Sequence, residues 1–122
     1  MTDPSASTGY LAEDEVSAAF AQELTADGSA WLLDVREDFE WEAGHAPGAH
    51  HIPLGELGSR QHELPEDQQI LVVCRSGARS RRATDALNEA NYPAANVEGG
   101  MSAWHATGAP VERSDGTPGA IV

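Results

Sequence analysis

Two short runs of apolar residues constrain the fold of this chain more than any other feature. They cover residues 31–35 and 70–74, and each is as long as a typical strand. Because the runs show almost no polar alternation, both faces of each strand should be covered, as in parallel sheets flanked by helices. Segments of helical period lie between the runs, so the sequence predicts an α/β domain around a mainly parallel sheet.

Weaker patterns place the other elements around these strands. Further short strands are expected at residues 10–11, around 51–52 and at 96–97. Apolar residues on one helical face predict a helix through residues 16–24 that ends near Asp27, with acidic residues 13–15 suited to its positive end. The remaining expected helices cover residues 38–43, 54–63, 78–90 and 101–106.

The length and the composition of the ends define one domain. A chain of 122 residues is long enough to bury a core but too short for two ordinary domains. Residues 1–8 are small and polar, and residues 114–119 are rich in Asp, Gly and Pro. We therefore predict a folded domain over 9–113, with a flexible N-terminal segment at 1–8 and a flexible C-terminal tail at 114–122.

Cys74, the only cysteine, ends the second apolar run and begins a basic stretch. Four of the seven basic residues, all arginine, follow it by residue 82, although the chain carries a formal charge of −13. A single cysteine forms no internal disulfide and no thiolate-rich zinc site, so either packing or reactivity explains it. The clustered charge favours reactivity, because cations stabilise a thiolate and attract anionic substrates.

The turn after Cys74 has the features of an anion-binding loop. Its residues are Cys74, Arg75, Ser76, Gly77, Ala78 and Arg79, with Ser80 in the helix that follows. Gly77 can adopt backbone angles closed to other residues, so successive N–H groups can point inward at the positive end of the helix. An ordinary thiol is about 3% ionised at pH 7, whereas a pKa near 6.5 makes it about three-quarters ionised. The simpler alternative is a buried core cysteine beside surface arginines.

Composition excludes several classes of partner and location. No apolar run approaches the ~18 residues of a membrane helix, and the first residues have no export signal, so we expect a cytoplasmic protein. The strong acidity argues against nucleic acid and anionic membranes as partners. His50 and His51 are adjacent and should face opposite sides of a strand, so no metal site is expected, and no cofactor is needed.

At the thiol turn the chain resembles the rhodanese family of sulfurtransferases. The segment Cys-Arg-Ser-Gly-Ala-Arg-Ser, from Cys74 to Ser80, matches the active loop of that family closely. Further matches occur in the same order at residues 33–37, 42–53, 98–104 and 108–111. One small departure is Ala46, where the family often has a bulkier aliphatic residue. The resemblance spans about residues 10–112.

The resemblance implies a rhodanese domain with five mainly parallel strands, helices on both faces, and a ping-pong reaction. Cys74 would take a sulfur from a small-molecule donor such as thiosulfate and pass it, as a persulfide, to cyanide or a thiol. The loop Arg75, Ser76, Gly77, Ala78, Arg79 and Ser80 would bind the sulfur. Asp34 and Arg36 would brace the neighbouring loop, although an exposed ion pair without a catalytic role is the simpler interpretation.

Two other functions stay open. A Cys–Arg loop also suits a phosphatase or an arsenate reductase, but related phosphatases have one more residue between the thiol and the arginine. Here Arg79 is the arginine and position 80 is serine, which favours sulfur chemistry. The second alternative is a carrier module that exchanges sulfur with a particular protein and barely turns over small molecules.

Overall fold

A computed structural model describes residues 10–122, and the predicted flexible segment 1–8 lies outside the described residues. Its centre is one five-stranded sheet in which every described strand pair is parallel. The strands, in order across the sheet, are β1 (Glu15–Val16), β5 (Ala94–Val97), β4 (Gln69–Val73), β2 (Ala30–Asp34) and β3 (His50–His51). The predicted α/β class and the five-stranded parallel sheet are confirmed.

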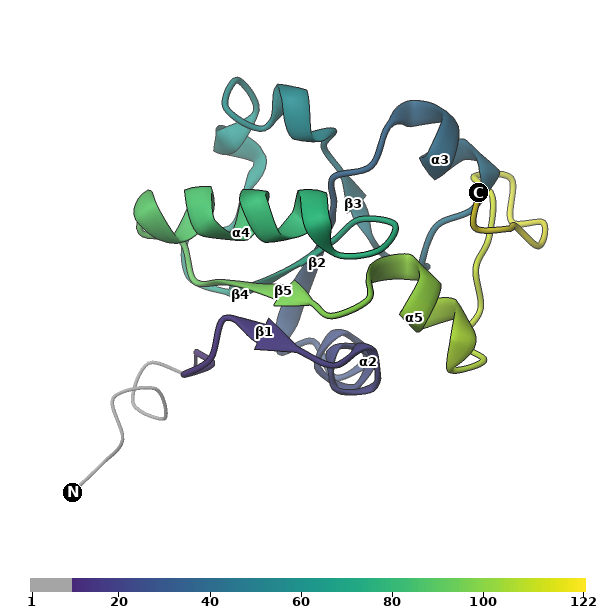
Figure 1. Ribbon diagram of the computed structural model, residues 1–122, viewed down its shortest axis with the longest axis horizontal. Coiled ribbons are helices and arrows are strands. Elements are labelled where there is room, and N and C mark those ends of the chain that lie inside the picture. Colours follow the sequence, from purple (N-terminus) through teal and green to yellow (C-terminus); the bar gives the residue numbers. More distant parts are fainter. Residues whose placement is uncertain (1–9) are drawn as a thin grey trace.

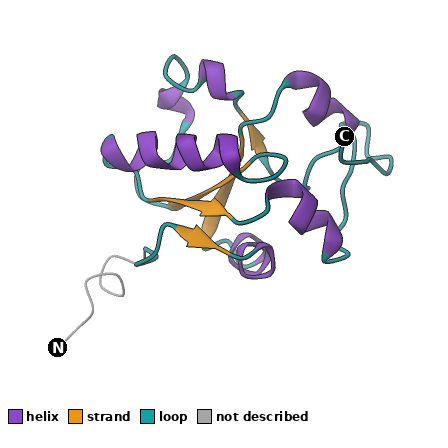
Figure 2. Cartoon of the chain, in the orientation of Figure 1, coloured by secondary structure: helices purple, strands orange, loops and turns teal. Residues whose placement is uncertain are grey.

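Helices cover both faces of this sheet (Figures 1 and 2). Their bounds are α2 (Ala18–Ala26), α3 (Asp38–Ala43), α4 (Ala78–Glu89) and α5 (Gly100–Ala106), with 3-10 turns η1 (Leu54–Glu56) and η2 (Gln61–Glu63). Helices α2 and α5 lie on one face, while α4 and the η1–η2 segment lie on the other (Figure 1). No helix among the described residues is both long and apolar enough to cross a membrane.

The apolar runs are continuous because β2 and β4 serve two cores at once. In β4, Leu71 and Val73 pack toward α2 and α5, whereas Ile70 and Val72 pack toward α4. Side chains alternate between the faces of a strand, so Cys74, the next residue in this register, belongs to the α4 side. The thiol is thus directed toward the helix that begins four residues later.

The N-terminal elements differ from the prediction. Residues 10–11 form no strand, and the acidic residues 13–15 do not start a helix. Instead β1 forms at Glu15 and Val16, because the amides of Asn96 and Glu98 need carbonyl partners and bond to the chain on both sides of Glu15. Ser17 then accepts a hydrogen bond from the Phe20 amide and caps α2.

Other predicted elements lie close to their expected places. Helices α3 and α4 begin where predicted, and β5 extends two residues before residue 96. The single helix expected over 54–63 is two 3-10 turns, since Gly55 and Gly58 weaken a continuous helix there. These turns form the wall opposite α4.

The segment after residue 113 folds back onto α3. The amide of Ala120 donates to the carbonyl of Ala43, and Gly119 donates to Val111. A side chain at Gly44 would meet the backbone of Ala120 at 2.6 Å, so this close approach depends on glycine. The expected flexibility of the tail stays a prediction, but the tail has specific partners in the structure.

Candidate active site

Cys74 lies at the carboxyl end of the central strand β4, between β2 and β5. Its side chain is 1% exposed, and the chain turns from it directly into α4. The turn requires Gly77, whose φ of 111° lies in the left-handed region that side chains rarely adopt. Strand β4 therefore places the sulfur at the N-terminal end of α4, where backbone N–H groups are free to bind an anion.

Two donors inside this turn reach the sulfur directly. The Gly77 amide donates to Cys74 Sγ over 3.1 Å, and the Ser80 hydroxyl donates over 3.2 Å. Burial alone raises the pKa of the thiol, because a buried thiolate loses its hydration. The Ser80 hydroxyl and the amides of the turn outweigh burial, and the pKa of Cys74 lies below its ordinary value. The geometry favours a thiolate.

Helix α5 fixes the first two peptide groups of the turn from outside. The Met101 amide donates to the Cys74 carbonyl over 2.7 Å, and the Ser102 amide donates to the Arg75 carbonyl over 2.9 Å. In a trans peptide the N–H points away from the C=O, so these bonds direct the amides of Arg75 and Ser76 toward the other side of the turn. Gly100 makes the approach possible, because a Cβ there would lie 2.4 Å from the Cys74 carbonyl oxygen.

Asn96 holds the far end of the turn from β5. Its side-chain amide donates to the Glu15 carboxylate over 3.0 Å and, over a longer 3.4 Å, to the Gly77 carbonyl. The Gly77 carbonyl also accepts the Arg81 amide, the first hydrogen bond of α4. The turn is therefore tied to the sheet and to two helices.

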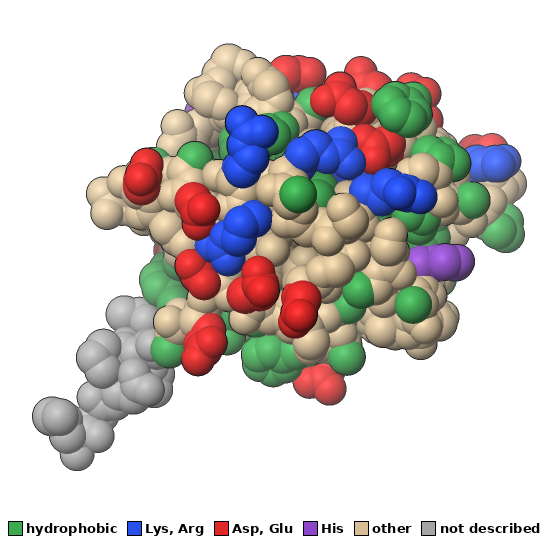
Figure 3. Space-filling view, in the orientation of Figure 1, with side chains coloured by type: hydrophobic (Ala, Val, Ile, Leu, Met, Phe, Trp, Pro, Cys, Tyr) green, Lys and Arg blue, Asp and Glu red, His purple; other side chains and the backbone are tan. Residues whose placement is uncertain are grey.

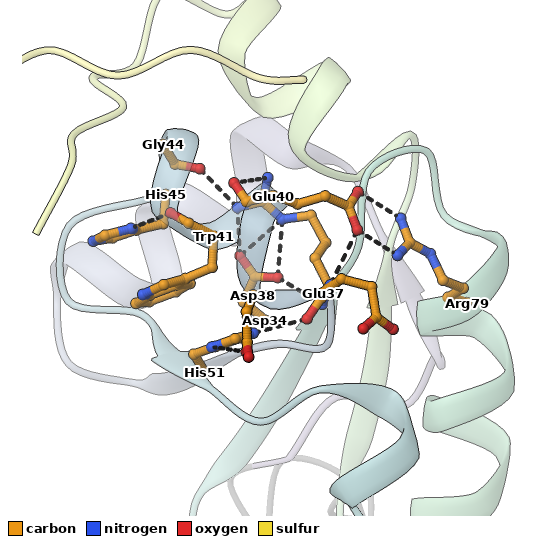
Figure 4. Close-up of polar contacts among 10 residues, drawn as sticks. Asp34, Glu37, Asp38, Glu40, Trp41, Gly44, His45, His51 and Arg79 are labelled. Carbon is orange, nitrogen blue, oxygen red and sulfur yellow. Dashed lines mark hydrogen bonds and ion pairs between the residues drawn. The ribbon is translucent and has the colours of Figure 1, made fainter.

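The guanidinium of Arg79 binds Glu40 rather than the sulfur. Two parallel hydrogen bonds of 2.6 and 2.8 Å join it to the carboxylate, which reaches across from α3 (Figure 4). The Arg79 hydrogen bonds are the main cause that lowers the pKa of Glu40, and Glu40 in turn raises the pKa of Arg79. This pair joins α3 to the first turn of α4.

Asp34 and Arg36 form a second pair that is fully buried, so the interpretation as an exposed ion pair is wrong. Arg36 donates from Nε and Nη2 to the Asp34 carboxylate over distances of 2.8 to 3.1 Å. Its remaining donors reach the backbone carbonyls of Glu40 and Gly44. The pair therefore braces α3, and α3 carries the carboxylate that binds Arg79.

The basic side chains gather on the face over the start of α4 and the preceding turn (Figure 3). Arg81 pairs with Asp14, Glu15 and Asp85. Arg75 and Arg82 are exposed and make no ion pair with a described carboxylate. These two arginines are thus available to anions from solution.

The histidines make separate contacts. His45 and His51 stack on the ring of Trp41 and bond to the carbonyls of Trp41 and Arg36 (Figure 4). His50 stacks on Trp31 instead, in keeping with opposite directions for neighbouring residues of a strand. Within residues 10–122, no group of three or more His, Cys, Asp or Glu side chains is placed to hold a metal ion.

Comparison with known proteins identifies this arrangement. A sequence model of the rhodanese-like domain matches residues 17–107. The chain belongs to the rhodanese-like family. The resemblance found in the sequence motifs is confirmed by this match, which includes every strand except β1 and the whole thiol turn.

Individual relatives carry sulfur-transfer names. A Bacillus subtilis protein named "Putative sulfurtransferase YtwF" is 40% identical over 88 residues, covering 72% of this chain and 85% of that protein. "Putative sulfur carrier protein YrkF" of the same organism is 42% identical over 70% of this chain but only 47% of its own length. The crystal structure of a rhodanese-related protein from Thermoplasma volcanium has a TM-score of 0.75 and 33% identity, covering 80% of this chain and 95% of that chain.

Two residues of this rhodanese-like site were missed in the sequence. Glu40 lies among the acidic residues of 37–42, a pattern typical of a helix start and a solvated face, yet it is buried and binds Arg79. Asn96 stands in an otherwise apolar β5 strand, and that interruption is the one signal that could have marked it. For Glu40 the only local signal is its place three residues after Glu37, which forms a capping box and says nothing about Arg79.

Replacing Gly100 by alanine should distort the thiol turn. The new Cβ would meet backbone atoms of Cys74 and Arg75 closer than 3 Å, so α5 or the turn must move. Gly108→Ala is the matched control, because Gly108 also has a positive φ but open space around it. We expect Gly100→Ala to lower the free energy of unfolding by about 1–3 kcal/mol more than Gly108→Ala. Equal losses in urea titrations would contradict this account.

Ser80→Ala should weaken the thiolate without changing the fold. Removing a hydrogen bond to an anion costs about 1.5–3 kcal/mol, so the pKa of Cys74 should rise by about one to two units. The rate of alkylation by iodoacetamide, measured from pH 5 to 10, reports this pKa. Ser76→Ala is the control, because Ser76 contributes its backbone amide rather than its hydroxyl. A shift of similar size in both variants would count against the Ser80 hydroxyl as the donor.

Glu40→Gln should remove stability that depends on pH. The folded protein lowers the pKa of Glu40, so the carboxylate contributes stability above the ordinary pKa of about 4.3, and that stability is lost as the pH falls through the lowered value. At pH 7 the variant should be less stable by about 1–3 kcal/mol, and near pH 3 the difference should shrink. Urea unfolding at both pH values measures it. A difference independent of pH would exclude the ionised carboxylate as its cause.

Proposed function

We propose that this rhodanese-like domain is a sulfurtransferase that carries a sulfane sulfur as a persulfide on Cys74. The observation that supports this most strongly is the hydrogen bonding of Sγ by Gly77 and Ser80 at the start of α4. A lowered thiol pKa increases the fraction of nucleophilic thiolate at a given pH without a histidine base. Sulfurtransferase names among the relatives support the same chemistry in general.

The reaction needs two displacement steps on one sulfur atom. The Cys74 thiolate attacks the outer sulfur of a donor such as thiosulfate, and the donor's S–S bond breaks with its electron pair leaving on sulfite. An acceptor, either cyanide or a thiolate, then attacks the outer sulfur of the persulfide. The Cys74–sulfur bond breaks and returns the electron pair to Sγ, so the cycle requires no external oxidant or reductant.

The turn offers further donors for the outer sulfur. The first N–H groups of α4 have no partner within the helix, and those of Ala78 and Arg79 are not among the groups that bind Sγ. These amides would stabilise the anionic outer sulfur without reorganisation. Arg75, which is exposed and makes no ion pair with a described carboxylate, would attract the dianionic donor. Arg79 would act mainly by fixing α4 through Glu40.

Two features weigh against phosphatase chemistry. The arginine follows the thiol after four residues, whereas the related phosphatase loops are one residue longer and hold a tetrahedral oxyanion. In addition, the Arg79 guanidinium is already bound at both ends of its fork by Glu40, so it is not free to clamp a phosphoryl group. Sulfur transfer uses the same turn without that clamp.

A carrier role in which the acceptor is a specific protein is the second candidate. It is favoured by the likeness to a protein whose name describes a sulfur carrier. Both roles share the Cys74 persulfide and differ in the acceptor. Steady-state turnover with thiosulfate and cyanide separates them, since a carrier would load once and turn over slowly.

The persulfide can be detected directly by mass. Treating the protein with thiosulfate should add one sulfur atom, about 32 Da, and later addition of cyanide should remove it. Cys74→Ser should gain no mass, while Ser76→Ala should load like the wild type. An identical mass gain in wild type and Cys74→Ser would refute the proposed intermediate.

A further inference from the structure

An apolar groove runs along α4, beginning beside the thiol turn. It has a volume of about 620 Å³ and lies between α4 and the segment that contains η1. This volume falls within the range of small-molecule sites in proteins. Arg79 and Glu37 line the end nearest the turn, and Ala90 lines the far end.

Small and aliphatic residues form both walls of this groove. On α4, Ala83 and Leu87 make the buried floor, and Ala86 contributes an exposed wall one turn later than Ala83. Opposite them lie Leu54 and Leu57, with Gly55, Gly58 and Gln61 beside them. No large side chain among residues 10–122 fills the space, so an apolar ring or chain from a ligand could remove these surfaces from water.

The groove adjoins the thiol turn at Arg79, the last residue of that turn. Ser80, whose hydroxyl bonds to Cys74 Sγ, belongs to the same helix face as Ala83 and Leu87. Six residues separate Ser80 from Ala86, which is about 9 Å along the helix axis. Cys74 and Ser80 are buried and do not line the groove, so a small molecule whose thiol reaches the turn would extend its body past Arg79 into the groove.

The charges along the groove favour an anionic group at Arg82, one turn of α4 beyond the end that Glu37 and Arg79 line. Arg82 lines it and makes no ion pair with a described carboxylate, whereas Arg79 is already paired with Glu40. The rest of the chain argues against a large anion, because a net charge of −13 repels an acidic protein over its whole surface. A small molecule meets mainly the local field of Arg82 within the screening length of about 8 Å.

We propose that this groove binds the sulfur acceptor, and that the preferred acceptor is a small thiol with an apolar body and an anionic group. The proposal rests on the proposed function of Cys74. The acceptor thiolate attacks the outer sulfur of the Cys74 persulfide and forms a new S–S bond. The old bond breaks with its electron pair on Sγ, and the product is the acceptor persulfide.

Three acceptor thiols separate the contributions of an apolar body and of an anionic group to the rate of sulfur transfer. 4-(Mercaptomethyl)benzoate carries both, benzyl mercaptan carries only the ring, and 3-mercaptopropionate carries only the carboxylate. The protein is first loaded with thiosulfate and freed of excess donor, and loss of the persulfide to each thiol is then followed by mass spectrometry. Each variant is compared with wild type on the same thiol, so differences in thiol pKa cancel.

Ala86→Phe fills the groove from an exposed position. It should slow transfer to both aromatic thiols about tenfold, as expected for lost apolar contact in a pocket, and change transfer to 3-mercaptopropionate less than about twofold. Ala106→Phe, also at an exposed helical position but on α5, is the matched control and should behave as wild type. Gly58→Leu fills the groove from the opposite wall and should repeat the Ala86→Phe pattern.

Arg82→Gln tests the charge separately. It should slow sulfur transfer to 4-(mercaptomethyl)benzoate and 3-mercaptopropionate by about two- to fivefold, the effect expected from loss of an exposed ion pair. The rate of transfer to benzyl mercaptan should not change. Arg113→Gln removes the same charge outside the groove and should have no selective effect.

Two results would overturn the proposal. One is equal slowing of all three thiols by both groove-filling variants, and the other is wild-type transfer in both of them. Failure of the underlying function has a different signature: wild-type protein would then gain no cyanide-removable sulfur at all. The two failures are therefore distinguished by the loading step alone.

Discussion

The hydrogen bonds from α5 to the carbonyls of Cys74 and Arg75 are the constraint on which the site depends. The first N–H groups of a helix and of the turn before it have no partner within the helix. Helix α5 fixes their direction here by binding the carbonyl side of two peptide groups. It comes close enough only because Gly100 has no side chain. Helix α5 therefore orients the amides that face the sulfur, although the helix itself makes no hydrogen bond to the sulfur.

A chain of ion pairs provides the second constraint, from the opposite side. Asp34 forms an ion pair with Arg36, and Arg36 donates hydrogen bonds to the backbone of α3 and the residue after it. Glu40 on α3 then forms an ion pair with Arg79. Because Glu40 neutralises Arg79, most of the stabilisation of the thiolate comes from neutral donors rather than from a direct ion pair. This matters for reactivity, since a thiolate loses nucleophilicity as its pKa falls. Here neutral hydrogen-bond donors lower the pKa of Cys74, while the guanidinium of Arg79 is bound to Glu40 rather than to the sulfur.

The sequence was sufficient for the parts of the structure that depend on local pattern. The runs at 31–35 and 70–74 located the central strands within one residue, and the residues from Cys74 to Ser80 located the turn, because strand burial and glycine conformation are encoded in neighbouring residues. What could not be predicted depends on distant partners. Glu40 and Arg79 are 39 residues apart, and β1 forms at residue 15 only because β5 supplies its hydrogen-bonding partners. Composition alone made the acidic residues 13–15 resemble a helix start, although they lead into β1.

The thiol turn is too small to determine substrate specificity by itself. In both half-reactions of the proposed cycle the turn would contact one sulfur atom, so it would not distinguish one donor or acceptor from another. Discrimination must come from surfaces that the rest of the ligand meets, and these differ around the turn. Arg75 lies beside Cys74 in the turn, while the apolar groove and Arg82 lie along α4. If the turn binds the sulfane sulfur as proposed, residues outside it would determine which molecules exchange that sulfur, while the turn itself stays the same.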